Sequence, residues 1–312
     1  MLPLRNFMSE TAETSVTTTK LIGAFAIIYI VWGSTYLAMR YAIETLPGFL
    51  MAAARFMLAG AFLFVWAWRK GARPSGPGAW RAAFVTGFLL LLMGNGTVVL
   101  AVSWVPSGLT ALLISTTPIW VALLEWARPG GKHPGGQVTT GLLMGFLGIM
   151  MLIGVGDISS GTVDILGACT LALSSISWAA GSIYARNVEV SESPFMTSGM
   201  QMLSGGVLLS IAGLLNGDLL RLTLTTPSFQ SVVAFFYLTI FGSVIAFTAY
   251  SWLVKAASPG RAITSSYVNP VVAVLLGWVM RGEPLTYRMV LAMATIILGV
   301  VVITSAKKDR KI

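Results

Sequence analysis

Long apolar segments recur along the whole chain, and they constrain its fold more than any other feature. A helix needs about 20 mostly apolar residues to cross the hydrocarbon core of a membrane. Hydrophobic residues make up 56% of this chain and charged residues only 10%, against about 25% charged in a soluble domain. The sequence therefore predicts an all-α membrane protein. Its ten expected transmembrane helices are 21–41, 48–68, 80–103, 107–126, 136–155, 163–186, 195–216, 229–254, 260–280 and 285–305.

Lysine and arginine are distributed unevenly among the breaks between these segments. If residues 1–20 form a cytoplasmic tail, the cytoplasmic side carries 15 basic residues and the external side 3. Such a bias predicts that both termini are cytoplasmic. The 15 are Arg5, Lys20, Arg69, Lys70, Arg73, Arg81, Arg128, Lys132, Arg186, Lys255, Arg261, Lys307, Lys308, Arg310 and Lys311, and the 3 are Arg221, Arg281 and Arg288. The first apolar segment is expected to be retained, because no cleavage pattern of small residues follows it.

The two halves of the chain resemble each other. "WGSTYLAMR" (32–40) aligns with "WAAGSIYAR" (178–186), and "TPIWVALLEW" (117–126) aligns with "NPVVAVLLGW" (269–278). Each half holds five expected helices, and an odd number places the second copy upside down in the membrane. Inverted repeats are typical of secondary transporters with alternating access. The expected organisation is a first repeat (21–155), an external linker (156–162), a second repeat (163–305) and a basic cytoplasmic tail (306–312).

Several stretches also carry a family resemblance. "IVWGSTYLAMRYAIETLPGFLMAAARFMLAG", "GNGTVVLAVSWVPSGLTALLISTTPIW", "SISWAAGSIYAR" and "SYVNPVVAVLLGWVMRGEPLT" resemble the ten-helix EamA-type branch of the drug/metabolite transporter superfamily. The resemblance extends over roughly residues 21–305. It implies two inverted five-helix repeats in a bacterial inner membrane and export of amino acids or similar small metabolites. It also implies a central cavity lined by helices 1–4 and 6–9, with helices 5 and 10 outside it.

Polar and aromatic residues inside the apolar segments are candidates for a substrate site, because each costs free energy in lipid unless it faces protein or a water-filled cavity. Aromatic rings can stack on an apolar substrate, and amides and hydroxyls can bind an ammonium or a carboxylate. The candidate substrate-binding residues are Trp32, Tyr36, Asn95, Thr97, Thr116, Trp178, Ser182, Gln201, Tyr250, Tyr267, Asn269 and Arg55.

Each of these types also has a structural explanation. Aromatic residues within spans pack helices together, and hydroxyls bond carbonyls of their own helix. Tryptophans near span ends are typical interface anchors, and we assign that role to Trp66, Trp68, Trp80, Trp126 and Trp278. Arg55 lies roughly 12 Å into its helix at helical rise. It could clamp a substrate carboxylate, but we favour a structural role in which it pairs with backbone carbonyls or with Glu44.

Two prolines occupy matching places in the repeats, Pro118 in "STTPIW" and Pro270 in "YVNPVV". Proline removes a backbone donor, so each leaves a carbonyl one turn earlier free for another partner. Each can also bend its helix. We predict that Pro118 and Pro270 belong to a pair of gating elements.

Several kinds of chemistry have no support in the sequence. Cys169 and His133 are the only residues of their types, so neither a disulfide nor a Cys/His metal site is expected, and no cofactor is expected. No motif for phosphate binding or for hydrolysis of the "HExxH" or "GxSxG" kind occurs. The carboxylates lie in tails, loops and span ends, with Glu125 the deepest, which favours facilitated transport over proton coupling. The net charge of +9 comes from loop residues and does not indicate nucleic-acid binding.

The sequence therefore predicts a secondary transporter that exports small zwitterionic metabolites, amino acids first, including aromatic or apolar ones. A multidrug or larger-metabolite exporter would share this architecture. A membrane enzyme acting on lipid is an alternative of another class, and it would need a polar catalytic cluster. The expected partners are the substrate and the bilayer. Gly141, Gly145 and Gly148 share one side of helix 136–155, where close packing within a monomer is favoured over a dimer contact.

Overall fold

The computed structural model describes residues 18–101, 114–131, 133–153, 165–257, 262, 264–281 and 285–305. The regular elements of these residues are all helices, and two of them, η1 and η2, have π-helical geometry. In chain order they are α1 (Thr18–Ile43), α2 (Gly48–Arg69), α3 (Ala79–Gly87), η1 (Phe88–Gly96), α4 (Thr97–Ala101), α6 (Thr117–Ala127), α7 (Gly136–Ile153), α9 (Ile165–Asn187), α10 (Pro194–Leu215), α11 (Asp218–Leu224), α12 (Phe229–Tyr237), η2 (Leu238–Phe247), α13 (Thr248–Ala256), α15 (Ser265–Arg281) and α16 (Tyr287–Ser305).

Every apolar segment marked in the sequence contains a described helix, although part of the segment 107–126 lies outside the described residues. Five helices of the described chain are long and apolar enough to cross a membrane: Thr18–Ile43, Gly48–Arg69, Ala79–Ala101, Pro194–Leu215 and Phe229–Ala256. The expected break between 216 and 229 differs from the prediction, because it contains the short helix α11. Gly217 has a left-handed φ of 76°, which ends α10 and lets α11 begin at once.

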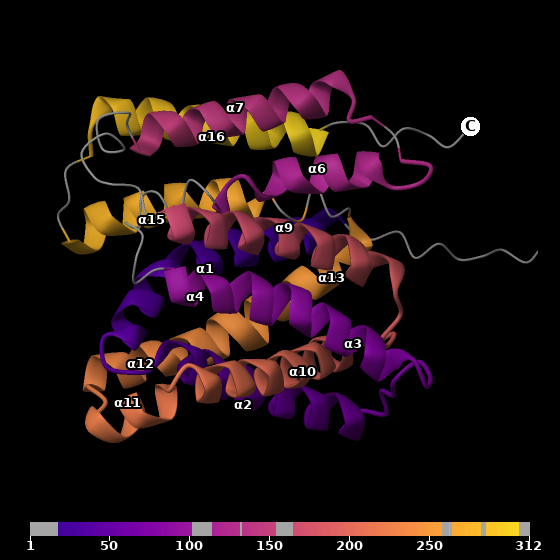
Figure 1. The fold of residues 1–312 in the computed structure, drawn as a ribbon. Coiled ribbons are helices and arrows are strands. Elements are labelled where there is room, and N and C mark those ends of the chain that lie inside the picture. The colour runs from indigo at the N-terminus through magenta and orange to yellow at the C-terminus, as the bar shows by residue number, and fades with distance from the viewer. Residues whose placement is uncertain are drawn as a thin grey trace, which may run out of the picture.

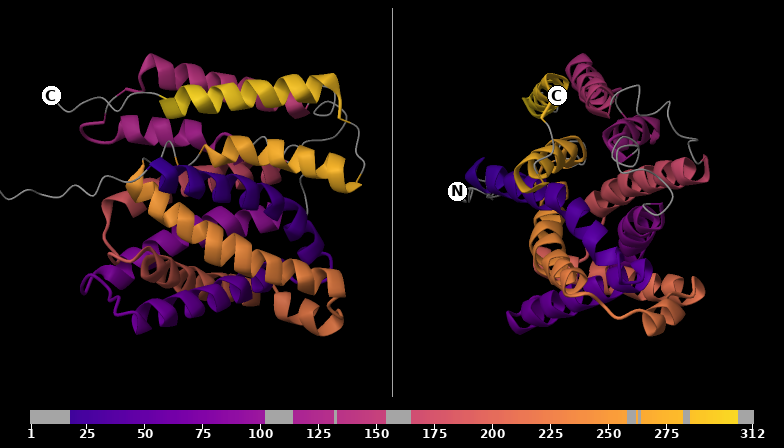
Figure 2. Two further views of the ribbon diagram at one scale, coloured as in Figure 1. Left: turned by 180° about the vertical axis from the view of Figure 1, so that it is seen from behind. Right: turned by 90° about the vertical axis from the view of Figure 1, so that its left-hand side faces the viewer.

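The helices lie side by side in a bundle, and a close helix pair bounds the bundle at each of two opposite sides, which we call its ends (Figure 1). The pair of α7 and α16 forms one end, and the pair of α2 and α10 forms the opposite end, with α11 beside it. Figure 2 shows the same separation from behind and from the side. We call these two helix pairs the end pairs. The helices α1, α6, α9 and α15, and the two helices interrupted by η1 and η2, lie between them.

Glycine allows each end pair to pack closely. A Cβ added to Gly60 of α2 would lie 2.9 Å from the backbone nitrogen of Leu203 in α10, and one added to Gly199 would lie 2.7 Å from that of Phe64. At the other end, a Cβ on Gly299 of α16 would lie 2.8 Å from the nitrogen of Gly145 in α7. Backbone contacts this close need small residues. The glycine face of α7 is therefore covered within the same chain, by α16 at Gly141 and Gly148 and by Tyr267 of α15 at Gly145.

The π-helical segments widen two of the inner helices, and other helices bond to their carbonyl oxygens. The hydroxyl of Ser174 in α9 donates to the Gly94 carbonyl oxygen at 2.6 Å, and the hydroxyl of Ser177 donates to the Leu89 carbonyl oxygen at 2.9 Å. In η2, the Gly242 carbonyl oxygen accepts a hydrogen bond of 3.3 Å from the Trp32 indole. Single-turn π geometry inside α-helices is often found at functional sites.

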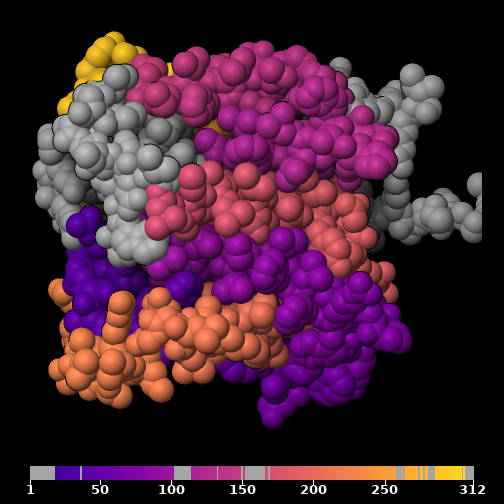
Figure 3. All heavy atoms as spheres, viewed as in Figure 1, coloured from indigo at the N-terminus to yellow at the C-terminus, as the bar shows by residue number. Residues whose placement is uncertain are grey.

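The outer surfaces of the helices are apolar. Leu58 and Phe62 of α2 and Ile211 and Leu214 of α10 are each at least half exposed. Figure 3 shows one face of the molecule, on which the side chains of α7, α6 and α9 fill successive rows. Apolar side chains exposed on long apolar helices are expected where the helices face the lipid of a membrane. Trp66, Trp68, Trp80, Trp126 and Trp278 are likewise exposed.

Candidate functional site

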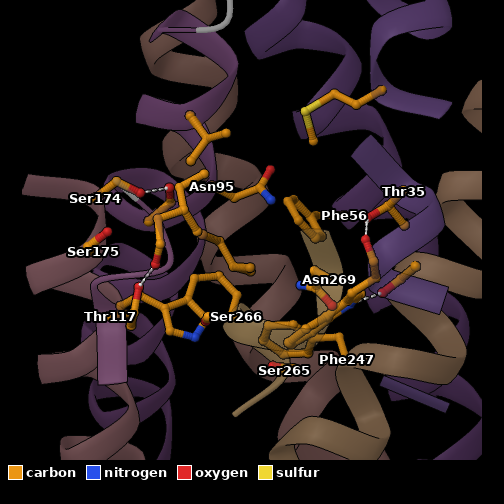
Figure 4. A pocket seen from close by; sticks show the side chains of 18 of the residues that line it. Thr35, Phe56, Asn95, Thr117, Ser174, Ser175, Phe247, Ser265, Ser266 and Asn269 are labelled. Atoms are coloured by element: carbon orange, nitrogen blue, oxygen red, sulfur yellow. Dashed lines mark hydrogen bonds between the residues drawn. The ribbon is translucent and has the colours of Figure 1, made fainter. Parts of the chain in front are cut away.

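A pocket lies among the inner helices, and its cavity volume is about 110 Å³. Figure 4 shows Asn95, Phe56 and Asn269 toward its middle, with Ser174, Ser175 and Thr117 on one side and Thr35 on the other. The described lining residues are Trp32, Thr35, Met39, Arg55, Phe56, Leu91, Gly94, Asn95, Val98, Ile114, Thr117, Ser174, Ser175, Trp178, Gly242, Phe247, Ser265, Ser266 and Asn269.

Most of the inner helices contribute to this lining, and so does α2. The end pair of α7 and α16 contributes no described residue, as the family resemblance implies for helices 5 and 10. The expected contribution of helix 195–216 is not seen, because the described side chains of α10 pack against α2, α3 and η1 instead. The pocket is thus built by segments that are far apart in the sequence.

Arg55 carries the charge of this pocket, and it is 4% exposed. One of its terminal nitrogens, Nη2, donates a 3.2 Å hydrogen bond to Oδ1 of Asn95. Its guanidinium lies 4.2 Å above the ring of Phe56, within the range of a cation–π contact. The nitrogen Nε has no hydrogen-bond partner within the described chain. The expected pairing of Arg55 with Glu44 or with backbone carbonyls is not formed among these contacts.

Asn269 faces the pocket from α15 and is 5% exposed. Its oxygen Oδ1 is buried and accepts no hydrogen bond from the described residues. Buried amide oxygens almost always have a donor, because leaving one unpaired costs free energy. The pocket therefore presents a cationic donor in α2 and a neutral acceptor in α15.

An aromatic cluster lies on the side of the pocket where Trp32 and Trp178 line it. The Trp32 ring is 5.6 Å from that of Trp178 and 5.0 Å from that of Tyr250. The Trp178 indole donates to the Tyr250 hydroxyl at 2.9 Å, and the hydroxyls of Tyr250 and Ser182 are also hydrogen-bonded. We call Trp32, Trp178, Tyr250 and Ser182 the aromatic cluster. It joins α1, α9 and α13 across the bundle.

Each tryptophan of the cluster also rests on a glycine of a π-helical segment. A Cβ on Gly94 of η1 would lie 2.7 Å from a ring carbon of Trp178. The corresponding glycine of η2, Gly242, accepts the indole hydrogen bond of Trp32. The pairs of Trp32 with Gly242 and of Trp178 with Gly94 are therefore matched across the bundle. At Gly94 this close approach of the indole requires glycine, whereas a Cβ on Gly242 would meet only the Thr35 side chain, 3.2 Å away.

The two proline stretches meet beside the pocket. Pro270 lies inside α15, so the carbonyl of Ser266 one turn earlier receives no bond from its nitrogen. The hydroxyl of Ser115 donates to this carbonyl oxygen at 2.9 Å. Pro118 stands in the first turn of α6, and the Ile114 carbonyl oxygen before it accepts from the hydroxyl of Thr117. The freed carbonyls are thus satisfied by neighbouring hydroxyls.

The structure brings together some of the residues proposed from the sequence. Trp32, Arg55, Asn95, Trp178 and Asn269 line the pocket. Ser182 and Tyr250 lie behind them in the aromatic cluster. The side chain of Tyr36 lies outside the described part of the structure, although its backbone belongs to α1.

Other proposed residues are placed elsewhere. Gln201 is buried between helices, and its Oε1 accepts from the Ser251 hydroxyl. The hydroxyl of Thr97 donates to the Met93 carbonyl oxygen of its own helix, and the hydroxyl of Thr116 accepts from the Trp120 indole. Tyr267 is fully buried, packs over Gly145 of α7 and donates to the Leu142 carbonyl oxygen.

Several lining residues were not among the candidates. Thr35 is one turn beyond Trp32, and Ser174 and Ser175 are one turn before Trp178. Helical spacing from these tryptophans would have found all three residues, since positions three or four apart share a face. Phe56 and Phe247 have no such signal, because apolar residues occur at every angle of these helices. The described residues contain no group of three His, Cys, Asp or Glu side chains that could hold a metal ion.

Comparison with known proteins places this architecture in a family. Residues 19–154 and 165–305 each match the EamA-like transporter family. YedA, an uncharacterized inner membrane transporter of Escherichia coli strain K12, is 37% identical over 288 residues, covering 92% of this chain and 91% of YedA. YvbV, an uncharacterized transporter of Bacillus subtilis strain 168, is 21% identical over 295 residues, covering 95% of this chain and 94% of YvbV.

A solved crystal structure has the same fold. It superposes with a TM-score of 0.73 at 21% sequence identity, and the match covers 92% of this chain and 97% of the other. The apolar helices, the two matched segments and the relative at 37% identity agree with one another. The chain is a multi-pass membrane transporter, and it belongs to the EamA-like transporter family of the drug/metabolite transporter superfamily.

Proposed function

We propose that the protein is a secondary transporter of the inner membrane that exports small zwitterionic metabolites by alternating access. Amino acids are the favoured class of substrate. The observation that carries this proposal is the pocket among the inner helices, with its polar groups and aromatic walls. Transport is proposed to be facilitated and not driven by ATP. The related inner membrane transporter of Escherichia coli supports the location.

The proposed architecture is ten membrane helices in two inverted repeats, 21–155 and 163–305, joined by an external linker at 156–162. Three features support it. The family matches the chain twice. The π-helical segments η1 and η2 fall at corresponding places of the two segments. Packing is also reciprocal: α1 contacts α12, η2, α13 and α15, while α9 contacts α3, η1, α4 and α6.

Alternating access is proposed to use the aromatic cluster and the two proline stretches. The cluster links α1, α9 and α13 through edge-on and tilted ring contacts and two hydrogen bonds, so opening the bundle there requires these contacts to separate. Pro270 lies inside α15, where the missing backbone bond lowers the cost of bending, and Pro118 stands in the first turn of α6, directly after the turn at 115–116. The charge bias supports cytoplasmic tails at 1–20 and 306–312.

A monomer is the proposed functional unit. The glycine face of α7, which could have formed a contact between two chains, packs on α16 of the same chain. A small-molecule substrate and the lipid bilayer are then the partners of the protein, without nucleic acid or cofactor.

Export of drugs or larger metabolites is a second candidate function, favoured by the apolar share of the lining, which includes Phe56, Leu91 and Phe247. Size selectivity separates the two functions. In competition experiments, amino acids are expected to compete with one another, whereas bulky cationic dyes should not. The reverse order of competition would favour the second function.

Counterflow in liposomes tests the proposal directly. Purified protein is reconstituted into vesicles loaded with an unlabelled amino acid, and uptake of the labelled one is followed without ATP. Saturable accumulation is expected, and Trp178→Ala should reduce it because the aromatic cluster loses its central ring. Trp66→Ala, at an exposed position, is the matched control. Absence of flux for all twenty amino acids would contradict the proposal.

A further inference from the structure

We propose that Arg55 binds the carboxylate of the ligand. A hydrogen-bond donor of the ligand next to this carboxylate then donates to Oδ1 of Asn269. Small amino acids and their 2-hydroxy analogues would then bind alike, and amides and amines would bind weakly. This inference deepens the proposed function and rests on it for the movement of the ligand, though not for its binding.

The charge of the pocket is the first step of the argument. Arg55 is almost fully buried, and a guanidinium withdrawn from water is costly unless a counter-charge or several hydrogen bonds compensate it. No acidic side chain occurs among the described residues that line the pocket. The described lining therefore carries one positive charge, and a carboxylate group of the ligand, placed beside Arg55, would balance it.

The contacts of Arg55 position the guanidinium without neutralising it. Asn95 offers a neutral oxygen to Nη2 at 3.2 Å, and Phe56 offers the face of its ring. Nε is left without a partner in the described chain. A planar guanidinium held on two sides in this way still presents parallel N–H groups, which match the two oxygens of a carboxylate. Asn95 is thus a positioning residue for Arg55.

The second recognition element is Asn269. Its Oδ1 is buried, lacks a donor within the described chain and belongs to the same pocket. An ammonium or a hydroxyl group next to the ligand carboxylate would supply that donor. Because the lining offers this donor an uncharged partner, binding does not depend on the positive charge of an amine. Hydroxy acids should therefore replace amino acids.

The rest of the lining sets the size and polarity of the ligand. Phe56, Leu91 and Phe247 are apolar, and the hydroxyls of Ser174 and Thr117 already donate to backbone carbonyls. The ligand beyond its charged end should therefore be small and apolar. An organic cation would instead meet the like charge of Arg55.

Binding to the purified full-length protein tests the inference, with tryptophan fluorescence as the readout because Trp32 and Trp178 line the pocket. The probes are leucine, phenylalanine, their 2-hydroxy acids, leucinamide and isopentylamine. The acids are expected to bind with dissociation constants within a few fold of one another, and the amide and amine at least about tenfold more weakly. Equal binding of leucinamide and leucine, or no saturable binding of any of the acids, overturns the inference.

Two substitutions identify the residue responsible. Arg55→Gln should weaken leucine binding at least about tenfold and leave leucinamide unchanged, while Arg69→Gln, exposed on the same helix, should change neither. Asn95→Asp should cause the same loss with Arg55 present, because the new carboxylate pairs with the guanidinium. The midpoint of thermal unfolding of this variant in detergent should match that of the wild type, and this measurement separates loss of binding from misfolding. Normal leucine binding in both variants overturns the inference.

The proposal of amino-acid transport and the proposal of carboxylate recognition by Arg55 can be refuted independently of each other. Carboxylate-selective binding without flux in loaded liposomes would remove the transport proposal and leave the carboxylate site in place. Flux of amino acids together with equal flux of the corresponding amines and amides would keep the transport proposal and remove the role of Arg55.

Discussion

Asp218 is a single side chain that joins two parts of the chain far apart in sequence. Its Oδ2 accepts from the backbone nitrogens of Phe49 at 2.9 Å and Leu50 at 3.2 Å, which belong to the first turn of α2. The residue before that helix, Pro47, supplies no side-chain cap. A buried carboxylate at a helix N-terminus satisfies free N–H groups and faces the positive end of the helix dipole. Asp218 therefore caps α2 from another element.

Asp218→Ala should lower the stability of the protein by about 1–3 kcal/mol, because two buried N–H groups lose their acceptor. The measurement is the midpoint of thermal unfolding in detergent. Asp218→Asn, which keeps one amide oxygen in place, should lie between Asp218→Ala and the wild type. Glu192→Ala, at an exposed position, serves as the control. An unchanged midpoint in Asp218→Ala would show that the cap contributes nothing.

At the scale of residues, the sequence indicates which side chains are anomalous but not which way they point. Asn95, Gln201 and Asn269 are all amides in apolar segments, yet Gln201 is bonded to Ser251 outside the pocket. The difference depends on the rotation of each helix about its axis. Long-range packing fixes that rotation. Because membrane helices are only weakly amphipathic, the pattern of residues does not show which side of each helix faces the pocket. Asp218 was missed for a related reason, since its partners lie 168 and 169 residues away.

The contact of α2 with α10 depends on the absence of a side chain at Gly60. A methyl group there would lie 2.9 Å from the Leu203 nitrogen and 3.0 Å from the Gly199 carbonyl oxygen, and neither backbone atom can move alone. Gly60→Ala is expected to destabilise the protein by about 1–3 kcal/mol through overpacking. Thermal unfolding in detergent measures this effect.

Gly23 of α1 provides the control, because a methyl group there would meet nothing within 4 Å. Gly23→Ala should be neutral or stabilising by up to about 1 kcal/mol, as alanine is the better helix former. If both alanine variants behaved alike, helix propensity and not close packing would explain the glycines.

Pro270 makes a separate prediction at the scale of elements. Pro270→Ala restores a backbone donor to the Ser266 carbonyl, which already accepts from Ser115, and should stiffen α15. We expect slower counterflow with undiminished thermal stability, measured on the same reconstituted protein. Pro227→Ala, in an exposed loop, is the control. Counterflow at the wild-type rate would exclude Pro270 as a gating residue.

The positions of the apolar helices are the part of the fold that the sequence predicts well, because apolar length is a local property. The π-helical segments are not predicted. Their widened turns depend on Ser174 and Ser177 of α9 and on Trp32 of α1, which bond to the exposed carbonyls from other elements. A pattern within 80–103 or 229–254 cannot show bonds of this kind.

At the scale of the molecule, each end pair combines one helix from each family-matched segment, α2 with α10 and α7 with α16. Rocking one segment against the other as a rigid body would break both close glycine contacts. Changes of access should therefore involve the helices between the end pairs, which supply most of the pocket lining. The pairs themselves should act as fixed walls.

The orientation of the whole molecule can be measured with single cysteines. In a Cys169→Ser background, Thr225→Cys should react with a membrane-impermeant maleimide on intact cells, because the charge bias predicts that this loop is external. Ser75→Cys should react only after the cells are permeabilised. Both positions are exposed, so access is decided by the membrane side. The opposite labelling pattern would invert the proposed topology.

The end pairs also set the order in which the protein can be completed during synthesis. About 150 residues separate Gly145 of α7 from Gly299 of α16, and ribosomes add roughly 5–20 residues per second, so α7 waits on the order of ten seconds or more for its partner. During that interval Gly141 and Gly148 lack the α16 residues that cover them. This wall is therefore complete only once α16 has been made, and a chain that lacks α16 should be degraded faster than the full chain.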